Sequence, residues 1–372
     1  MNNFTIIALV IFFCHITNIT STLLIATQVF VKILIVPVVE LLSRNIEVRP
    51  EEMLLGFTPP ARFAKVRFSN YSPNIQFPSQ ANIRTKLEQA IRQSNQKNLL
   101  ELFKKNSPAP SYYLDGGFGV GKTHLLAASW HEFNGNKHFL SFAELTFFIG
   151  ALGMDKAITA FSNAKLICID EFELDDVGNT LIVSKFLSAL IPRGTRVITT
   201  SNTLPEQLGE GRFNTADFKR EIQGIAAHFE SYRIDGADYR HREGLAAPEP
   251  FSSLKLKTSF NNANGNVTML EFDDLLRHLG QQHPIRYNKM LEGLNAVYIN
   301  GIAPIQKQDD ALRFVHFIDK LYDREIRLSV AGISLEGLFL PSYRNGGYAK
   351  KYSRCLSRLG ELMRESMLEK AI

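Results

Sequence analysis

The middle of the chain alternates between short apolar runs and longer stretches with apolar residues at helical spacing. The runs at 111–114, 137–142, 165–169 and 195–200 each predict a β-strand, and a helix is predicted after each of the first three. This alternation is typical of a parallel sheet with helices on its faces. We therefore expect an α/β fold whose ligand site lies at the carboxyl ends of the strands.

The residues before this alternation form a preamble with a different pattern. A polar stretch opens it, and Ser79 is predicted to cap a helix that runs to about Lys104. Pro108 and Pro110 then interrupt the chain before the first strand. Residues 45–110 are therefore expected to be a helical and extended preamble to the central sheet.

The residues after the alternation predict a smaller domain. A stretch rich in alanine and proline at 246–250 indicates a linker. Beyond it, a helix near 272–279, a strand at 296–299 and an amphipathic helix at 311–322 predict an α+β domain. We accordingly divide the chain into an N-terminal extension of residues 1–44, the preamble of 45–110, a core of 111–245 and a C-terminal domain of 246–372.

The first forty residues are unusually apolar, above all at 6–14 and 23–39. A helix that crosses a bilayer needs about 20 apolar residues. The second run approaches this length but contains Lys32 and Pro37, and neither a basic region nor a cleavage site of a secretory signal is evident. Three interpretations stay open: a membrane anchor formed by residues 23–39, a weak targeting segment, or an upstream extension outside the functional protein.

The composition of the 372 residues is that of an ordinary globular protein, with 45% hydrophobic and 21% charged residues. The net charge of +5 is too small to argue for nucleic acid or for an acidic surface as a partner. Cys14, Cys168 and Cys355 stand far apart, so neither a disulfide framework nor a zinc site is expected. We expect a cytoplasmic protein, with membrane association only if residues 23–39 form an anchor.

Residues Gly116 to Thr123 match the phosphate-binding pattern G-x-x-x-x-G-K-[ST], the Walker A motif of a P-loop. Its glycines let backbone N–H groups face a phosphate chain. Lys122 is expected to reach the β- and γ-phosphates, and the Thr123 hydroxyl to bind Mg²⁺. An accidental glycine-rich turn is the alternative, but a predicted strand precedes the motif and a predicted helix follows it. The residues expected to contact ATP are Gly116, Gly117, Phe118, Gly119, Val120, Gly121, Lys122, Thr123 and His124.

A second motif lies at the end of the third predicted strand, where an apolar run ends in Asp170 and Glu171. This is the Walker B pattern of a buried parallel strand. Asp170 is expected to bind Mg²⁺, and Glu171 to polarise the attacking water. The alternative is a core strand that ends in a solvated acidic turn, because Glu173, Asp175 and Asp176 follow closely. The spacing from the Walker A motif, which fits two strand–helix units, favours the Walker B interpretation.

The fourth predicted strand ends in small polar residues, and Asn202 is among them. A polar side chain at that point is expected to lie beside the Walker B strand, because the carboxyl ends of parallel strands meet at one edge of the sheet. There it can hold the attacking water or contact the γ-phosphate. Asn202 is therefore our candidate for this sensor role, and a turn-forming Ser-Asn pair is the alternative.

Three stretches carry a family likeness: Asp170 to Asp176, Thr200 to Leu208 and Asp238 to Arg242. With these stretches the chain resembles the ZapE cell-division ATPase family, whose mitochondrial relatives are the AFG-one-like ATPases. The resemblance extends from about Leu54 to Met363. It implies an AAA+-type P-loop NTPase that hydrolyses ATP with Mg²⁺ and works as a homo-oligomer. Bacterial members of the family act in division under stress, and mitochondrial members act in protein quality control.

One departure from the family concerns arginine. The family commonly carries an arginine-rich segment just before the phenylalanine that matches Phe218, where this chain has Thr215 and Asp217 instead. Arg212 and Arg220 lie on either side, and either is a candidate for an arginine finger that acts on the nucleotide of a neighbouring subunit. Exposed arginines without such a role are the alternative.

Further cationic residues follow in the C-terminal domain. Arg313 could fold back on the nucleotide as a second sensor, or it could be a surface arginine or part of a salt bridge. Lys351, Arg354 and Arg358 fall on one face of the last predicted helix, where we expect a solvated cationic face. Contact of that face with nucleic acid, acidic lipid or a partner is the alternative.

Together these features favour a Mg²⁺-dependent ATPase coupled to the remodelling of a protein partner in cell division or protein quality control. The alternative is a nucleic-acid-associated ATPase that resembles a helicase loader. No basic stretch interleaved with stacking aromatics supports it, so nucleic acid is not the expected partner. A third hypothesis is a nucleotide-dependent membrane adaptor anchored by residues 23–39.

Overall fold

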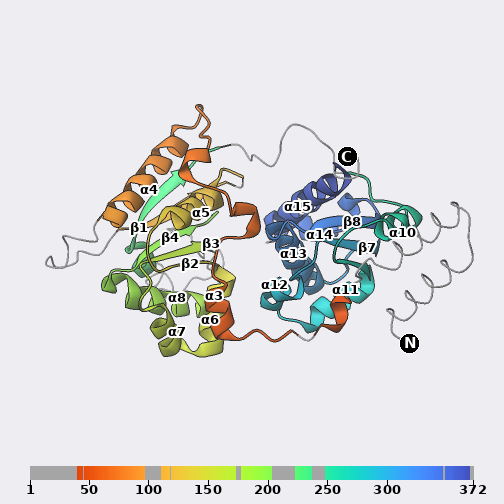
Figure 1. Cartoon of the computed structure of the whole chain (residues 1–372), viewed down its shortest axis with the longest axis horizontal. Helices are drawn as coiled ribbons and strands as arrows, with labels where there is room; N and C mark the ends of the chain where they lie inside the picture. The colour runs from red at the N-terminus through yellow and green to blue at the C-terminus, as the bar shows by residue number, and fades with distance from the viewer. Residues whose placement is uncertain are drawn as a thin grey trace, which may run out of the picture. The chain divides into compact units, whose positions relative to one another are not determined.

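The computed structural model of this chain describes residues 40–44, 46–96, 110–117, 119–172, 177–202, 223–236, 248–346 and 348–368. By their contacts these residues form two units (Figure 1). The first unit is Glu47–Leu245, and the second unit joins the described residues up to Ile46 with Ala246–Ile372. The four-part division of the chain expected from the sequence stays a prediction.

The first unit is built on a five-stranded sheet in which all neighbouring strands run parallel. The strands lie in the order β2-β3-β4-β1-β5, so β4 separates β1 from β3. Every residue of β1 and β4 is buried, as befits the centre of a parallel sheet, whereas β5 is an edge strand with exposed polar residues. The expected α/β fold is confirmed. The strands are β1 (Ser111–Gly116), β2 (Lys137–Ser141), β3 (Leu166–Asp170), β4 (Arg196–Thr200) and β5 (Phe229–Ile234).

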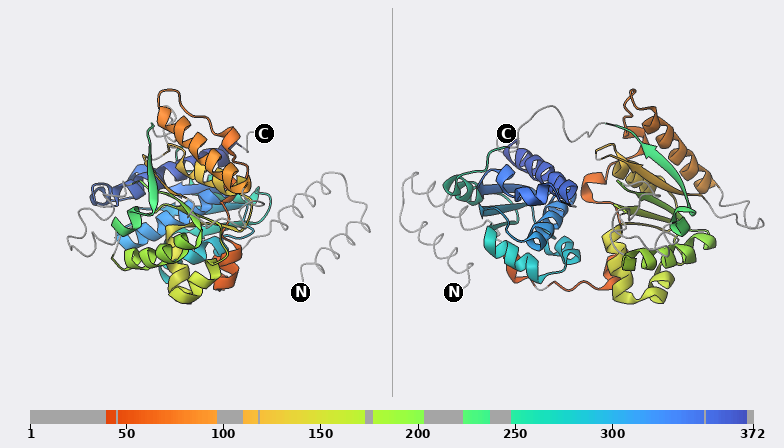
Figure 2. Two further views of the ribbon diagram at one scale, coloured as in Figure 1. Left: turned by 90° about the vertical axis from the view of Figure 1, so that its left-hand side faces the viewer. Right: turned by 180° about the vertical axis from the view of Figure 1, so that it is seen from behind.

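Helices cover both faces of this sheet (Figures 1 and 2). Alternate strand residues serve the two faces, because successive side chains of a strand point in opposite directions. Tyr112 and Leu114 lie in the core with α4 and α5, while the Tyr113 ring packs edge-on against Phe172. The helices are α4 (Pro78–Gln96) and α5 (Lys122–Glu132) on one face, and α6 (Phe142–Leu152), α7 (Met154–Phe161) and α8 (Val177–Leu190) on the other, followed by η5 (Ile191–Arg193).

The preamble packs onto the first unit. It contains the short helices α3 (Pro50–Leu55), η2 (Ala61–Phe63) and η3 (Phe68–Asn70), and it leads into α4. The α4 helix begins at Pro78, so Ser79 is inside the helix and is not the predicted cap. The Ser79 hydroxyl accepts a hydrogen bond from the Asp235 N–H, 2.9 Å away, which ties α4 to the end of β5.

The second unit is also a parallel sheet with helices, formed by β6 (Val267–Glu271), β7 (Ala296–Ile302) and β8 (Arg327–Gly332) in that order. One helix, α10 (Ser253–Asn261), packs on one face. The other face carries α11 (Phe272–Gln281), α13 (Gln308–Asp323) and α15 (Ala349–Leu368). The remaining short helices are η1 (Leu41–Ser43), η7 (Pro284–Arg286), α12 (Tyr287–Met290), η8 (Leu335–Gly337) and α14 (Pro341–Arg344).

This arrangement corrects the α+β domain expected from the sequence, because strand and helix alternate as β6-α11-β7-α13-β8 and the strands are parallel. The pattern missed β6 and β8 because Thr268 and Ser329 interrupt their apolar runs. Both residues are buried, and the Ser329 hydroxyl is hydrogen bonded to that of Ser366, 2.9 Å away. A buried hydroxyl can lie in a core strand when it has a hydrogen-bond partner, so an apolar pattern alone does not identify such a strand.

The last helix, α15, does not present the solvated cationic face expected from the sequence. Arg354 Nη2 lies 2.8 Å from Asp319 Oδ2, and Arg358 Nη1 lies 2.5 Å from Asp319 Oδ1. Arg354 is 8% exposed, and the Arg358 guanidinium lies 5.0 Å from the centre of the Tyr322 ring. The expectation was wrong for these two arginines because a carboxylate of α13 pairs with both and draws them into the interface between α13 and α15.

The residues that follow the apolar N-terminal stretch pack within the second unit. Leu41 is fully buried, and Arg44 Nη1 donates to the carbonyl oxygens of Met290 and Glu292 at 2.6 and 2.8 Å. Residues 23–39, the suggested membrane segment, lie outside the described residues. Among the helices that the structure does describe, none combines the length and the apolar character that a bilayer span requires.

Candidate nucleotide-binding site

The phosphate-binding loop begins where β1 ends, and its backbone could be built only with glycine. Gly116 has a φ of 148°, and a Cβ placed on it would lie 2.3 Å from the carbonyl oxygen of Ile234 in β5. Gly119 and Gly121 have φ values of 70° and 91°, in the left-handed region that favours glycine. The loop therefore forms a cradle whose inner surface is backbone, as a phosphate site requires.

Lys122 is the first residue of α5, so its side chain starts at the rim of the cradle. Its Nζ donates to the carbonyl oxygens of Gly116 and Gly117, at 2.8 and 2.5 Å. The ammonium group thus lies against the loop itself. The N-terminal end of α5 adds further N–H donors and the positive end of the helix dipole at the same place.

The Walker A and Walker B residues come together across β4. The Thr123 hydroxyl is 3.2 Å from each carboxylate oxygen of Asp170, to which it donates. The Thr200 hydroxyl, at the end of β4, also donates to Asp170 Oδ1. A hydroxyl, a carboxylate and a second hydroxyl therefore converge at the carboxyl edge of three neighbouring strands.

The Asp170 carboxylate is partly accessible but crowded by protein. Burial raises the pKa of Asp170 above the ordinary carboxyl value, and the charge of Glu171 raises it further. The hydrogen bonds from Thr200 and Thr123 oppose this shift. The ionised form of Asp170 is thus held by two hydroxyls, and a cation bound at this point would favour it.

Glu171, the predicted catalytic base, has an unusual backbone conformation with a φ of 53°. This left-handed conformation is costly for a residue with a side chain. The Glu171 N–H donates to the Thr200 hydroxyl at 3.1 Å, and the next N–H, of Phe172, donates to the Thr200 carbonyl at 2.7 Å. Thr200 therefore holds the turn that carries Glu171.

Sequence reasoning gave Thr200 no role, although it lies in a stretch that carries the family likeness. A hydroxyl residue at the end of the strand beside Walker B was the available sign. Asn202, the residue predicted as a sensor, follows β4 by two positions and is partly exposed. Its strand is the neighbour of both β1 and β3, as the prediction required.

The other predicted residues are placed as follows. Phe118, Arg212 and Arg220 lie outside the described residues. Arg313 belongs to the second unit, where its Nη1 is 3.9 Å from Asp310 Oδ1 one turn earlier on α13. His124 is on the first turn of α5, and its ring nitrogen Nε2 lies 3.1 Å from the Asn70 side-chain oxygen. The His124 side chain therefore contacts the preamble, which the sequence did not indicate.

The site has the donor set that ATP and Mg²⁺ require. The glycine cradle and Lys122 fit a phosphate chain, and the paired Thr123 hydroxyl and Asp170 carboxylate are the oxygen ligands that Mg²⁺ prefers. Within the part of the chain that the structure describes, no group of three or more histidine, cysteine or acidic side chains could hold a metal ion.

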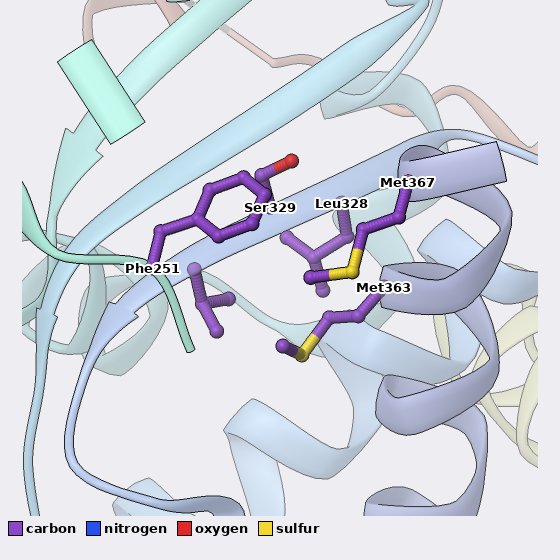
Figure 3. A pocket seen from close by; sticks show the side chains of 6 residues that line it. Phe251, Leu328, Ser329, Met363 and Met367 are labelled. Carbon is purple, nitrogen blue, oxygen red and sulfur yellow. The ribbon is translucent and has the colours of Figure 1, made fainter. Parts of the chain in front are cut away.

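A small cavity with no room for a water molecule lies in the second unit, between β8 and the end of α15 (Figure 3). Its walls are apolar apart from Ser329, whose hydroxyl is bonded to Ser366. The cavity thus offers no polar group to orient a ligand. It is lined by Phe251, Leu328, Ser329, Val330, Met363 and Met367.

A parallel sheet with a glycine cradle after β1, a lysine at the start of the next helix and an acidic pair after β3 defines the class of P-loop NTPases. Within this class, the model of the AFG1-like ATPases matches residues 56–263 and 252–371, which is most of the chain. The chain belongs to the AFG1-like ATPase family. The resemblance found in the sequence is thereby confirmed.

Individual relatives are similar at a lower level. Cell division protein ZapE of Escherichia coli (strain K12) is 24% identical over 309 residues, which cover 72% of this chain and 81% of that protein. Lactation elevated protein 1 homolog B of Danio rerio is 24% identical over 282 residues, 60% of this chain and 56% of that protein. A crystal structure of DnaI is 17% identical with a TM-score of 0.39, covering 50% of this chain and 98% of that one. A score of this size carries no functional argument.

Proposed function

We propose that this protein binds ATP at the loop Gly116 to Thr123, hydrolyses it with Mg²⁺, and uses the energy to remodel a protein partner as a homo-oligomer. The observation that carries the proposal is the contact between the two motifs. The hydroxyls of Thr123 and Thr200 both donate to the Asp170 carboxylate. A loop that only bound phosphate would need no acidic pair beside it.

The residues divide the work as follows. The backbone N–H groups of the cradle and the Lys122 ammonium bind the phosphates, and Thr123 with Asp170 would hold Mg²⁺, whose charge offsets that of the phosphate oxygens. Glu171, on its turn beside Thr200, takes the proton from the attacking water. Asn202, on the neighbouring strand end, orients that water or the γ-phosphate.

Hydrolysis is tested with three variants of the full chain. Lys122→Ala should lose ATP binding, and Glu171→Gln should bind ATP but turn it over roughly 100-fold more slowly, the lower end of what a general base contributes. Lys156→Ala, an exposed lysine on α7, is the matched control and should behave as wild type. Robust turnover by Glu171→Gln would show that another group is the base.

The oligomer and its arginine finger are tested by mixing inactive variants. If Arg212 or Arg220 acts on a neighbouring subunit, its alanine variant mixed with Glu171→Gln should recover activity, because some interfaces then combine an intact arginine with an intact glutamate. Each variant alone should be inactive. An active arginine variant, or a mixture with no recovery, would remove that residue from the proposal.

Because the Escherichia coli relative is named as a cell division protein, we propose a protein of division, or of protein quality control, in the cytoplasm. Full-length Glu171→Gln loaded with ATP should retain that partner, and Lys122→Ala should not. A titration with single-stranded DNA over a range of salt concentrations separates the nucleic-acid alternative, which requires tight binding that weakens steeply with salt.

A further inference from the structure

A short segment of the preamble, Arg67 to Tyr71, packs against α5 and contacts the phosphate-binding loop through Tyr71. Tyr71 is 8% exposed, and its hydroxyl donates to the carbonyl oxygen of Val120 at 3.1 Å. Its ring occupies the space beside Gly121, where a Cβ would lie 2.6 Å from Tyr71 Cε2. The tyrosine thus touches the loop with both its hydroxyl and its ring.

The bond to Val120 has a consequence for the inside of the loop. In a trans peptide the C=O and the N–H of one unit point in opposite directions and move together as a plane. The carbonyl of Val120 shares its peptide with the N–H of Gly121. A hydroxyl that holds this carbonyl therefore directs the Gly121 N–H to the opposite side of the peptide, away from Tyr71.

We infer that Tyr71 is a positioning residue of the nucleotide site, which fixes the Val120–Gly121 peptide so that its N–H is ready to bind a phosphate. The inference rests on the proposed function, because it assumes that the cradle binds nucleotide. A backbone donor that is already oriented saves the cost of ordering it when the ligand binds. Removing the hydroxyl should therefore weaken nucleotide binding without touching any group that contacts the ligand.

The rest of the segment holds Tyr71 in place. The Tyr71 and His124 rings meet edge-on with centroids 5.3 Å apart, and His124 Nε2 lies 3.1 Å from Asn70 Oδ1. That same Asn70 oxygen accepts the Arg67 N–H at 2.8 Å. The segment is tied to the far end of α5 as well, because the Phe68 N–H donates to Glu132 Oε1 at 2.8 Å. The segment Arg67 to Tyr71 therefore contacts both the phosphate-binding loop and α5.

The hydroxyl of Tyr71 keeps its proton under ordinary conditions. Burial raises the pKa of Tyr71 to about 12, so the hydroxyl remains a donor at neutral pH. A carbonyl oxygen can only accept, which means that the bond depends on this proton.

The competing explanation is that Tyr71 merely stabilises the core. The second unit supplies a matched control, because the buried Tyr287 hydroxyl donates to the Leu279 carbonyl at 2.9 Å. Both Tyr→Phe changes delete one buried hydroxyl-to-carbonyl bond and keep the ring. Only Tyr71→Phe removes a bond to the phosphate-binding loop.

The experiment is a titration of the full-length protein with a fluorescent ATP analogue and, separately, with ADP, below the melting temperature of every variant. Tyr71→Phe should raise both dissociation constants about fivefold, the size expected for one net hydrogen bond. Tyr287→Phe should change them less than twofold. Both variants should lower the melting temperature by similar amounts.

Equal dissociation constants for Tyr71→Phe and Tyr287→Phe would overturn the inference, whatever the melting temperatures. Lys122→Ala is run beside them: if it binds as tightly as wild type, the proposed function fails, and not only the role of Tyr71. If Tyr71→Phe does not fold, Asn70→Ala replaces it. Loss of the contact between Asn70 and His124 should raise the dissociation constant of the nucleotide about twofold. An unchanged constant would mean that the segment Arg67 to Tyr71 does not hold the loop in place.

Discussion

Two aspartates, the partly accessible Asp170 of the first unit and the buried Asp319 of the second, have opposite environments. Asp319 in the second unit is paired with Arg354 and Arg358. Burial alone would raise its pKa, but the charges of the two arginines outweigh burial and hold the pKa of Asp319 well below its usual range. Asp170 in the first unit receives hydrogen bonds from the hydroxyls of Thr123 and Thr200, and its pKa is raised.

The difference follows from where each carboxylate lies in a similar fold. In the first unit β4 separates β1 from β3, so the strand order reverses at the carboxyl edge, where Asp170 lies. Ligands of parallel sheets bind at such a point. In the second unit the order β6-β7-β8 follows the chain. Asp319 is between two helices instead. Among the described residues Asp170 forms no ion pair, and it is the carboxylate that we propose to meet a ligand.

The largest effect is expected from Asp319→Asn. It leaves two guanidinium groups without their shared partner, and we expect the free energy of unfolding of the second unit to fall by about 3–5 kcal/mol. Trp130 is the single tryptophan and belongs to α5, so its fluorescence follows the first unit, while far-UV circular dichroism follows both. The urea midpoint should therefore fall by circular dichroism and stay constant by fluorescence.

Asp310→Asn is the matched control for this prediction. Asp310 lies on the same helix and pairs with Arg313 at 3.9 Å, where both side chains keep contact with solvent. Exposed pairs of this kind contribute roughly 0–1 kcal/mol. An equal loss of unfolding free energy in the two variants would mean that the ion pairs of Asp319 with Arg354 and Arg358 do not stabilise the contact between α13 and α15.

Asp170→Asn should give the reverse result. The ionised carboxylate is disfavoured where it lies, so removing its charge should leave the stability of the first unit unchanged or slightly higher. ATP turnover should fall at least roughly 100-fold, because loss of a metal ligand removes several kcal/mol of charge stabilisation. The measurements are Trp130 fluorescence in urea and steady-state hydrolysis. If Asp170→Asn lowered stability as much as Asp319→Asn, the two carboxylates would not differ in how they affect the stability of their units.

The sequence predicted the parts of this contrast that depend on local pattern. The strands β1 to β4 of the first unit each contain a short apolar run, and Gly116 to Thr123 combine residue types that a phosphate site needs in one short stretch. Asp170 and Glu171 follow directly from the end of such a run. These features need no information about distant residues, which is why the fold and both motifs were found.

The sequence could not predict the contacts that join distant residues. Asp319 belongs to a different helix from Arg354 and Arg358, so two cations that spacing places on a solvated face are paired with a carboxylate in the structure. Tyr71 reaches Val120 across 49 positions of the chain. Thr200 is a hydroxyl residue at the end of a predicted strand, but its contacts with Asp170 and Glu171 depend on β4 lying beside β3. Long-range packing decided each of these cases.

The effect of Asp319→Asn on stability should also depend on pH. The folded pKa of Asp319 is lowered, so its contribution is fully present above the unfolded pKa of about 3.9 and is lost as the pH falls through the folded value. The difference in unfolding free energy between wild type and Asp319→Asn should be constant from pH 7 to about 5 and should narrow in more acidic solution. A series of urea titrations by circular dichroism measures it. A difference that disappears above pH 5 would show that the two arginines do not hold the carboxylate ionised.

The smallest effects come from two neighbouring threonines of β4, and they test what keeps Asp170 and Glu171 in place. Thr200→Val removes the donor to Asp170 and the acceptor of the Glu171 N–H, so kcat should fall about tenfold while nucleotide affinity stays within about twofold. Thr200→Ser keeps the hydroxyl and should restore most of the rate.

Thr199 is also fully buried, but its hydroxyl has no hydrogen-bond partner among the described residues. Thr199→Val should therefore leave the rate unchanged and stability equal or higher, because it relieves an unsatisfied buried group. If both valine variants slow hydrolysis equally, the effect comes from packing in β4, and the hydroxyl of Thr200 does not position the acidic pair.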